Sequence, residues 1–375
     1  MKRIIHLTIS DCKSERRIFN QAFSALDWGY HVHIIALKTP DTPAIEKLKG
    51  IHIRRLRCRF WRGGPLKFII FNWKAFGYLL RQRTNIIHAH DLWVLPAAVF
   101  AARIKRIPVV YDAHEYYRGL LVFQKKSLAG LLWKWVEKRL IGHVQALITI
   151  NSHHAQLYQR AYPGVKVKVI KNVPRRSEIP APLPRSQRKS VIIYQGLFRP
   201  GRGLEYIIPA MAKLPEGELW LVGHGELEDV LRRQVHQYQI VQRVKFWGFQ
   251  PYSQMLAITT QAMAGIALFT GDHLNYQFAS PNKFFEYIQA GTPVIATDIP
   301  TFRQFISRYS VGYLIPESRI STELPQIMQR LLTDSHLWES YHQQCLQAAK
   351  EWNWETEAPH LQSLYKEIEN KRGSK

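Results

Sequence analysis

Apolar residues recur along the first half of the chain in two alternating patterns. Short runs rich in isoleucine, valine and leucine occupy residues 3–9, 31–37, 51–55, 85–89, 109–112, 146–150 and 167–170. The segments between them place apolar residues at helical spacing. Strands that alternate with helices in this way predict an α/β fold with a parallel, doubly wound sheet.

A proline-rich stretch at residues 174–184 interrupts this alternation. Proline has no N–H to donate to a sheet, so we expect a linker at residues 176–190. Strands are then expected at 191–194, 218–222, 244–246, 264–268 and 293–296. The sequence therefore predicts two Rossmann-like domains, residues 1–175 and 191–354. Helices are expected from about residue 323 onward, including 331–350 and 359–368. The last helix, at about 355–375, is expected to pack back on the first domain.

The composition is that of a globular chain, with 46% hydrophobic and 21% charged residues among 375. The most apolar stretches, 68–80 and 128–136, contain lysines and fall short of the ~20 residues that a membrane-spanning helix needs. The N-terminus lacks the features of a secretory leader. Cys12, Cys58 and Cys345 form no CxxC pair. We therefore expect no spanning segment, disulfide framework or zinc ribbon, and a reducing compartment.

Positive charge is concentrated in the first half of the chain. Residues 1–180 hold 32 lysines and arginines against 10 acidic residues, whereas residues 181–375 hold 20 against 18. A basic half beside a nearly neutral half indicates that one domain meets a polyanion, either nucleic acid or an anionic membrane.

Two segments of the basic half combine cations with apolar bulk. In the first, five arginines lead into the apolar residues 67–80; they are Arg54, Arg55, Arg57, Arg59 and Arg62. In the second, residues 125–139, four apolar side chains share one helical face, namely Leu128, Leu131, Leu132 and Trp135. Each segment alone is typical of an amphipathic helix that packs on the core and exposes its other face to solvent. The charge asymmetry favours a membrane-facing interpretation for the pair. Nucleic-acid binding is the alternative explanation for the positive charge, but we find no motif of a known nucleic-acid-binding domain in the sequence.

The most informative segment is 280–298, SPNKFFEYIQAGTPVIATD. Ser280 and Pro281 predict a helix start, Gly291 and Pro293 predict its end, and a buried strand follows. The start of such a helix offers free N–H groups and a positive dipole end to a diphosphate. Glu286 lies where a carboxylate could accept both hydroxyls of a ribose. The alternative is a surface acid on an ordinary αβ unit.

This segment resembles the donor-site signature of the family-4 retaining glycosyltransferases. Three further stretches resemble that family in the same order: 194–205, YQGLFRPGRGLE; 219–225, which ends in Gly223-His224-Gly225; and 244–248, VKFWG. The resemblance implies the GT-B fold, in which two Rossmann-like domains face a central cleft.

The resemblance also implies roles for residues of the second half. Glu286 would bind the nucleotide ribose, and Arg202 would neutralise the departing diphosphate, as a metal-free site requires. The remaining donor-site candidates are Gly196, Gly223, Gly225, Ser280, Asn282 and Lys283, the last two through their backbone N–H groups. The chain departs from the family pattern at Leu197 and Phe278, where many relatives have Arg and Glu. Arg199 could replace the missing arginine.

In the first half, IHAHD at 87–91 and VYDAHE at 110–115 also resemble family segments, and each ends an expected strand. The resemblance implies that His114 approaches the donor sugar. The other candidates for the cleft and the acceptor are His90, Asp91, Asp112, Glu115, Arg16 and Arg17. For the two arginines, a solvated helix face is the alternative. His88, His90 and Asp91 suggest a metal site, but we argue against it because alternate strand residues point to opposite faces.

The sequence thus predicts a metal-independent, cofactor-free, retaining hexosyltransferase. Its donor would be a nucleotide-diphospho-sugar. Its acceptor would be a lipid-linked or membrane-associated glycan of polysaccharide or lipopolysaccharide assembly, and we expect no nucleic-acid partner. The expected location is cytoplasmic, on the inner face of the cell membrane. The alternatives are a basic nucleic-acid-binding protein, a GT-B-type sugar epimerase and a catalytically silent paralogue.

Overall fold

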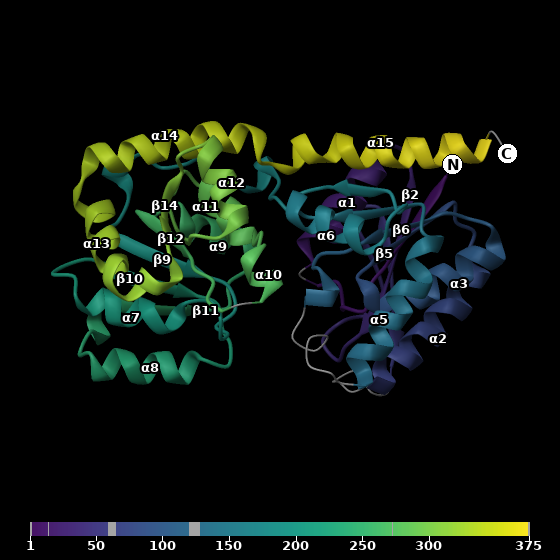
Figure 1. Cartoon of the computed structure of the whole chain (residues 1–375), viewed down its shortest axis with the longest axis horizontal. Helices are drawn as coiled ribbons and strands as arrows, with labels where there is room; N and C mark the ends of the chain where they lie inside the picture. The colour runs from purple at the N-terminus through teal and green to yellow at the C-terminus, as the bar shows by residue number, and fades with distance from the viewer. Residues whose placement is uncertain (1, 14, 59–64, 120–127, 272, 374–375) are drawn as a thin grey trace. The chain divides into compact units, whose positions relative to one another are not determined.

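The computed structural model describes residues 2–13, 15–58, 65–119, 128–271 and 273–373. The chain divides into two compact units: unit 1 comprises residues 1–171 and 357–375, and unit 2 comprises residues 172–356 (Figure 1). Arg59 and Arg62 of the first basic segment and residues 125–127 of the second lie outside the described residues.

Unit 1 is built on an eight-stranded sheet with the order β3-β4-β2-β1-β5-β6-β7-β8. Its strands are β1 (Arg3–Leu7), β2 (His31–Lys38), β3 (Ile45–Leu48), β4 (Ile51–Arg57), β5 (Ile86–His90), β6 (Val109–Asp112), β7 (Ala146–Thr149) and β8 (Val167–Val169). The expectation of a wholly parallel sheet is wrong at one edge, because β3 pairs with β4 antiparallel. Lys49 and Gly50, both at positive φ, form the two-residue turn between them, which is the backbone conformation that a tight hairpin needs.

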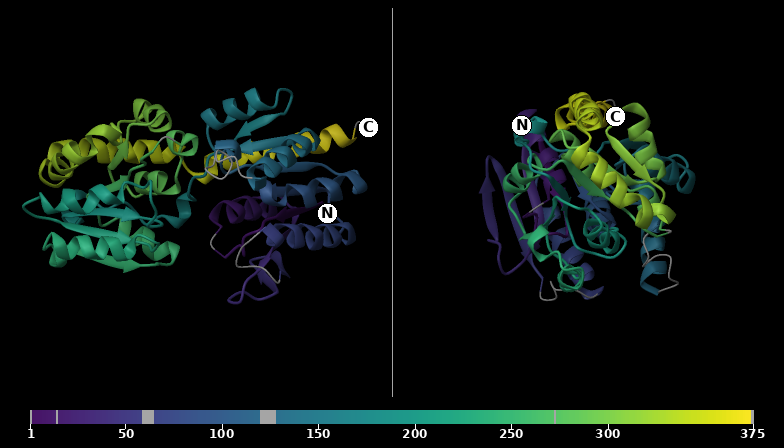
Figure 2. Two further views of the ribbon diagram at one scale, coloured as in Figure 1. Left: turned by 60° about the horizontal axis from the view of Figure 1, so that its bottom comes forward. Right: turned by 90° about the vertical axis from the view of Figure 1, so that its left-hand side faces the viewer.

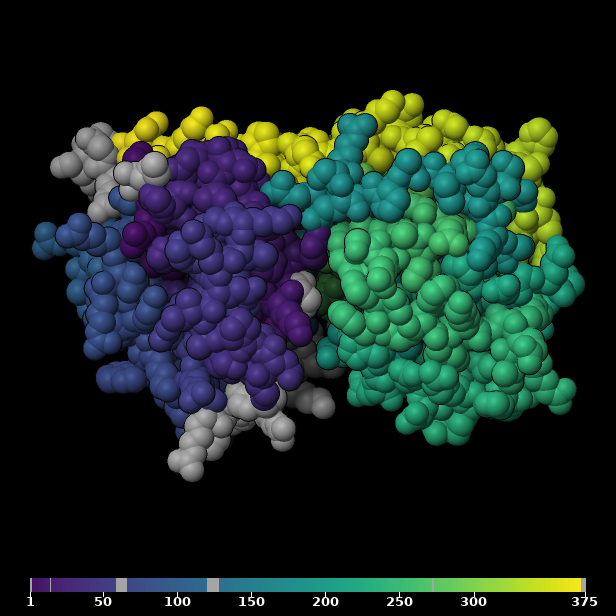
Figure 3. Space-filling view, turned by 180° about the vertical axis from the view of Figure 1, so that it is seen from behind, coloured from purple at the N-terminus to yellow at the C-terminus, as the bar shows by residue number. Residues whose placement is uncertain are grey.

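The helices of unit 1 are α1 (Arg16–Asp27), α2 (Pro65–Arg81), α3 (Leu95–Lys105), α5 (Leu128–Leu140), α6 (Ser152–Ala161) and most of α15 (Trp354–Gly373). The C-terminal helix lies along this unit, as the yellow segment beside the purple N-terminal residues in Figure 3. Tyr365 on α15 is buried and packs edge-on against Trp28 and Tyr30. Aromatic packing thus holds α15 on unit 1.

Unit 2 contains a six-stranded parallel sheet with the order β11-β10-β9-β12-β13-β14. Its strands are β9 (Val191–Gln195), β10 (Glu218–Val222), β11 (Val244–Gly248), β12 (Ala264–Ala267), β13 (Val294–Thr297) and β14 (Gly312–Ile315). Its helices are α7 (Leu204–Ala212), α8 (Glu228–Gln237), α9 (Tyr252–Thr259), α10 (Leu274–Gln277), α11 (Asn282–Gln289), α12 (Pro300–Arg308), α13 (Ile320–Thr333) and α14 (Ser335–Glu351). The edge strand β14 is an addition to the sequence prediction.

Both faces of the unit 2 sheet are covered, as expected of a doubly wound fold (Figure 2). Along β9, Ile192 and Tyr194 belong to one core cluster with α7, α8 and α13. Val191 and Ile193 belong to a second cluster with α9, α11, α12 and α14. Alternate strand residues point to opposite faces, which explains why β9 is apolar at every one of these positions. In the part of the chain that the structure describes, no helix is both long and apolar enough to cross a bilayer.

Candidate functional site

The start of α11 is the centre of the candidate donor site in unit 2. Pro281 is its N-cap residue, and no side chain caps the first turn. The helix is closed at its other end by Gly291, at φ +64, where the N–H of Thr292 donates to the carbonyl of Tyr287 at 2.9 Å. The helix start and stop lie where the sequence predicts them. Because first-turn N–H groups have no acceptor within a helix, this end of α11 presents donors and a positive dipole end.

Lys283 and Ser280 bring two unsatisfied polar groups to this helix start. The Lys283 Nζ is buried 3.5 Å from the centroid of the Tyr194 ring, and no described residue forms a hydrogen bond with it. Burial lowers the pKa of Lys283 well below its usual value, and the nearby Arg202 lowers it further. The Ser280 hydroxyl is also buried without a hydrogen-bond partner among the described residues. Buried polar atoms are usually paired, so these two groups, together with the first-turn N–H groups of α11, make the helix start a candidate anion site.

The loop after β9 reaches the same lysine. A side-chain carbon at Gly196 would lie 3.5 Å from the Lys283 Nζ. Gly223 and Gly225 pack directly against this loop, because a side-chain carbon at Gly223 would lie 1.9 Å from the Gly196 carbonyl oxygen, and one at Gly225 would lie 2.4 Å from that of Phe198. Gly223 and Gly225 therefore set the position of the loop that carries Gly196.

The structure distinguishes the two candidate arginines. The Arg202 guanidinium stacks over two aromatic rings, 4.6 Å from the centroid of Phe269 and 5.3 Å from that of Tyr276. It also lies close enough to influence the titration of Lys283. The Arg199 side chain is exposed. Arg202 is thus held in one orientation beside Lys283, whereas Arg199 is directed to solvent.

Glu286 lies on α11 one turn after Lys283. Its carboxylate is buried and accepts a hydrogen bond from the Gln195 side-chain amide. The amide oxygen of Gln195 accepts a hydrogen bond from the Thr259 hydroxyl at 2.6 Å. This chain of contacts orients the carboxylate that sequence reasoning selected. The two departures from the family pattern bring no charge: Leu197 is exposed, and Phe278 is half-buried directly after α10.

In unit 1, an ion pair between Arg17 and Asp112 lies at the C-terminal edge of the sheet. Arg17 donates to Asp112 through Nε at 2.9 Å and Nη2 at 2.8 Å, and Gln21 adds a bond of 2.6 Å. Arg17 Nη1 donates to the carbonyl of Ile170 at 3.0 Å. Both charged side chains are buried. Burial alone would raise the pKa of Asp112, but Arg17 and then His114 hold it well below its usual range.

Three calls from the sequence need correction here. Arg17 is neither a solvated residue nor available to an acceptor phosphate, because its guanidinium is buried and fully engaged. Asp112 and His90 are buried as well, so neither lines a surface. The physical reason is shared: residues within β5, β6 and the buried face of α1 are covered by the layers of the sheet and its helices, and only residues beyond the strand ends reach the surface.

Beneath this edge lies a stack of three buried histidines. Parallel pairing of β1 with β5 sets His6 beside His88, and the rings of His6, His88 and His90 stack at centroid distances of 4.6–5.2 Å. His6 Nδ1 lies 2.9 Å from His90 Nε2, and His88 Nδ1 lies 2.6 Å from the Tyr365 hydroxyl. Burial lowers the pKa of all three, so the stack is neutral near pH 7.

His114 and Asp91 form the accessible part of the site. His114 Nδ1 lies 3.5 Å from an Asp91 oxygen, and His114 Nε2 lies 3.7 Å from an Asp112 oxygen. Burial lowers the pKa of His114, but the two carboxylates outweigh it and raise the pKa to about 9. Asp91 has φ +73 and ψ +158, a region that is almost restricted to glycine and costs about 1–3 kcal/mol. A strained acid against a cationic histidine is typical of a functional site.

The remaining candidates of unit 1 lie around this pair. Glu115 is exposed, and its carbonyl accepts a hydrogen bond from the Tyr158 hydroxyl at 3.0 Å. Arg16 is half-buried in the first turn of α1. Glu15, which sequence reasoning did not select, precedes α1, and its pKa is raised by burial while His114 opposes the shift.

Among the residues that the structure describes, two groups of side chains have the spacing to hold a metal ion: His6 with His88 and His90, and His90 with Asp112 and His114. His88 and His90 lie two positions apart on β5, so they share a face and their rings stack. Asp91, the third residue of the set considered from the sequence, belongs to neither group. Neither group suits a metal. The rings of the first are nearly parallel, so their lone pairs do not converge, and Asp112 in the second is already bound by Arg17.

Besides Glu15, sequence reasoning missed several side chains that shape the two candidate sites, among them His6, Gln21, Gln195 and Tyr365. His6 ends the first strand at the same depth as His88, and strand pairing alone could have suggested it. Tyr365 lies 277 residues from His88 and carries no local signal.

Comparison with known proteins extends over both units. Residues 14–173 match Glycosyltransferase Family 4, and residues 175–352 match Glycosyl transferases group 1. A phosphatidyl-myo-inositol mannosyltransferase of Mycobacterium leprae is 24% identical over 292 residues, which are 76% of this chain and 74% of that protein.

Two solved structures share the architecture. Anabaena HepE, in complex with UDP-glucose, superposes with a TM-score of 0.74 at 17% identity and covers 98% of this chain and 100% of its own. WaaG, a glycosyltransferase involved in lipopolysaccharide biosynthesis, superposes with a TM-score of 0.74 at 14% identity and covers 96% of this chain and 98% of its own. At these identities the structures establish the fold.

Proposed function

Because the chain belongs to the family-4, group 1 glycosyltransferases and has their GT-B fold, we propose that it is a retaining, metal-independent enzyme that transfers a hexose from a nucleotide-diphospho-sugar. The carrying observation is the buried Lys283 Nζ, which has no hydrogen-bond partner among the described residues and lies near Arg202 at the start of α11. HepE, with a similar fold, binds UDP-glucose, which supports a donor of this class.

The proposed chemistry breaks the bond between the sugar C1 and the diphosphate oxygen. Negative charge then grows on the leaving phosphate, where two fixed cations and the first-turn N–H groups of α11 can stabilise it. The acceptor hydroxyl attacks C1 on the face that the phosphate leaves, and the phosphate takes the hydroxyl proton. No carboxylate base is required, which is consistent with the engagement of Asp112 by Arg17. We propose that no metal or other cofactor takes part.

In this scheme Glu286 accepts the ribose hydroxyls, and Gln195 holds its carboxylate in place. His114, cationic because its pKa is raised to about 9, donates a hydrogen bond to the donor sugar. Asp91 orients the imidazole through Nδ1. Each contact uses a side chain whose position is set by a strand end or a helix turn.

We further propose that the acceptor is a lipid-linked or membrane-associated glycan of polysaccharide or lipopolysaccharide assembly. Residues 1–171 and 357–375 together carry 34 lysines and arginines against 12 acidic residues. Each cation near an anionic leaflet is worth about 1 kcal/mol. The names of the mannosyltransferase and of WaaG point to lipid and lipopolysaccharide acceptors. Peripheral attachment to the inner face of the cell membrane follows from this proposal.

Thermal-shift measurements with UDP, GDP and ADP and their sugar conjugates test the donor assignment, because a ligand stabilises the folded state by mass action. We expect one nucleotide series to raise Tm, and no response to any series would refute the proposal. NMR of the product from the stabilising donor reports the anomeric configuration, and an inverted product would overturn the retaining mechanism. Hydrolysis without transfer would favour the epimerase alternative. Binding of random DNA in a gel shift would favour the nucleic-acid alternative.

A further inference from the structure

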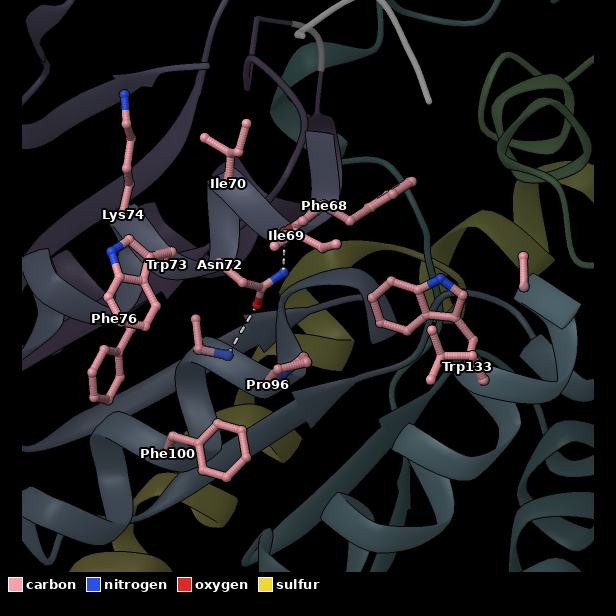
Figure 4. Close-up of a pocket in the computed structure, with 13 residues that line it drawn as sticks. Phe68, Ile69, Ile70, Asn72, Trp73, Lys74, Phe76, Pro96, Phe100 and Trp133 are labelled. Carbon is pink, nitrogen blue, oxygen red and sulfur yellow. Dashed lines mark hydrogen bonds between the residues drawn. The ribbon is translucent and has the colours of Figure 1, made fainter. Parts of the chain in front are cut away.

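An apolar groove lies between α2, α3 and α5 of unit 1, and none of the candidate site residues described above lines it. It has a volume of about 770 Å³, within the roughly 300–1,000 Å³ typical of small-molecule sites. Figure 4 shows its aromatic walls. The aromatic residues are Phe68, Trp73, Phe76, Phe100 and Trp133, and Leu132 also lines the groove. A groove of this size is large enough to enclose a ligand.

The polar side chains among the lining residues are engaged within the protein. Asn72 donates through Nδ2 to the carbonyls of Phe68 and Trp93, both at 2.8 Å, and its Oδ1 accepts from the Ala97 N–H at 3.0 Å (Figure 4). Lys74 donates to the carbonyl of Arg57 at 2.7 Å. The lining side chains thus provide few hydrogen-bonding groups for a polar ligand, so the groove favours a hydrocarbon ligand.

Large apolar side chains are exposed around the groove. The exposed fraction is 77% for Trp73 on α2 and 86% for Leu128 on α5. Others on the three helices are Ile69, Phe100, Leu131, Leu132 and Trp135. This many large exposed apolar side chains on three neighbouring helices is unusual for a protein that meets only water.

Lysine and arginine side chains lie among these exposed apolar residues, and their positive charge indicates what kind of ligand the groove binds. The Lys67 Nζ lies 5.5 Å from the Phe68 ring centroid, and the Arg139 guanidinium lies 5.6 Å from that of Trp135. Lys134 and Lys138 belong to the same helix as Trp135. Aromatic and aliphatic bulk beside lysine and arginine matches the interface of an anionic membrane. The complementary ligand is an amphiphile with a hydrocarbon chain and a negative head.

We propose that this groove binds the hydrocarbon chain of the lipid-linked acceptor. The inference rests on the proposed function, because it names where the lipid part of that acceptor is held. The chain lies along Phe76, Phe100 and Trp133, and the surrounding lysines and arginines contact the anionic head and the leaflet. Affinity then depends on chain length, because each buried methylene contributes about fourfold.

A binding assay with alkyl phosphates tests the groove without knowledge of the acceptor. Butyl, octyl, decyl and dodecyl phosphate, below their aggregation limits, are titrated against the full chain by tryptophan fluorescence, with inorganic phosphate as the headgroup control. We expect affinity to rise by up to about fourfold per methylene. Equal affinities across the series would overturn the proposal.

Three variants tie the effect to the groove. Ala129 is exposed and lines it, so Ala129→Trp should fill it and reduce the affinity for dodecyl phosphate by at least tenfold. Leu132→Gln should flatten the chain-length dependence. Leu131→Trp is the matched control, because Leu131 is exposed on the same helix but does not line the groove; its affinity should equal that of the wild type. A loss as large as that of Ala129→Trp would overturn the assignment.

Two further measurements distinguish the possible failures. The thermal shift with the stabilising nucleotide reports unit 2. Because the three variants lie on α5 in unit 1, their circular dichroism spectra show whether they are folded. A retained shift with no alkyl-phosphate binding in the wild type would reject the groove proposal and leave the transferase proposal intact. A wild-type dimer that Ala129→Trp converts to monomer would assign the groove to a second copy of the chain and overturn the lipid assignment.

Discussion

Replacement of Lys283 by methionine should stabilise the protein and weaken donor binding at the same time. The two side chains have similar length, so packing against Tyr194 is kept while the ammonium is removed. In the free protein the Lys283 Nζ is buried without a hydrogen-bond partner among the described residues. The native state therefore carries an unsatisfied polar group that the variant lacks.

The magnitude follows from the cost of such groups. A buried, unsatisfied donor costs about 1–3 kcal/mol, and more when it is charged. Lys283→Met should therefore raise the free energy of unfolding by about 1–3 kcal/mol. For a unit the size of residues 172–356, each kcal/mol corresponds to roughly 2–4 °C in Tm.

Donor affinity should change in the opposite direction. A hydrogen bond from a charged group to phosphate is worth about 1.5–3 kcal/mol, so the Kd for the stabilising nucleoside diphosphate should rise roughly 10- to 150-fold. The exposed Lys213 in the same unit offers a matched control. Lys213→Met should leave both Tm and Kd near their wild-type values.

The pH dependence adds a second signature. Burial, with Arg202, lowers the pKa of Lys283 in the folded state, so the unfolded chain binds this proton more tightly. Wild-type stability therefore gains from this group as pH rises from the lowered pKa toward the usual value near ~10.4. The advantage of Lys283→Met should be largest at the acid end and shrink as pH rises. Diphosphate binding should raise the pKa and take up a proton, which calorimetry in buffers of different ionisation enthalpy can detect.

Urea unfolding of unit 2 tests the predicted gain in stability, and isothermal titration calorimetry with the nucleotide tests the predicted loss of affinity. If Lys283→Met lowers stability and leaves the Kd unchanged, the lysine is part of the core and the anion-site reasoning is wrong. A lower stability together with a higher Kd would contradict the claim that the free site is unsatisfied.

Three further predictions concern charged residues of the candidate sites in unit 1 and unit 2. Arg17→Met leaves Asp112 buried without its cation and should cost about 3–5 kcal/mol in urea unfolding; a change below 1 kcal/mol would contradict the buried pair. Asp91→Gly relieves a backbone strain of about 1–3 kcal/mol, and the added backbone entropy of the unfolded state offsets about 1 kcal/mol of this gain. We therefore expect Tm to stay the same or rise while turnover falls. A large drop in Tm would show that the backbone at Asp91 is not strained. Arg202→Ala should lower kcat by about 10²–10³-fold in a donor-turnover assay, whereas the exposed Arg199→Ala should leave it close to the wild-type value; equal effects would remove the distinction drawn between them.

Much of the architecture could be predicted from the chain itself. Short apolar runs identify β6 and β10 at their observed bounds, because a strand buried on both faces is apolar along most of its length. The start and end of α11 are encoded locally, by Pro281 and by Gly291 at positive φ. Glu286 and Arg202 could be selected as candidates because ordered motifs and their spacing are also local properties.

What the local pattern could not supply is which residues of distant elements meet. Arg17 has the sequence context of a surface helix, yet it is buried because α1 packs where β6 presents Asp112. The histidine stack depends on the pairing of β1 with β5 and on Tyr365 from the far end of the chain. The short edge strands β3 and β14 form only beside their partners. Periodicity thus determined the elements and the local motifs, whereas tertiary packing decided which charges are buried, because burial and pairing depend on neighbours that are remote in the sequence.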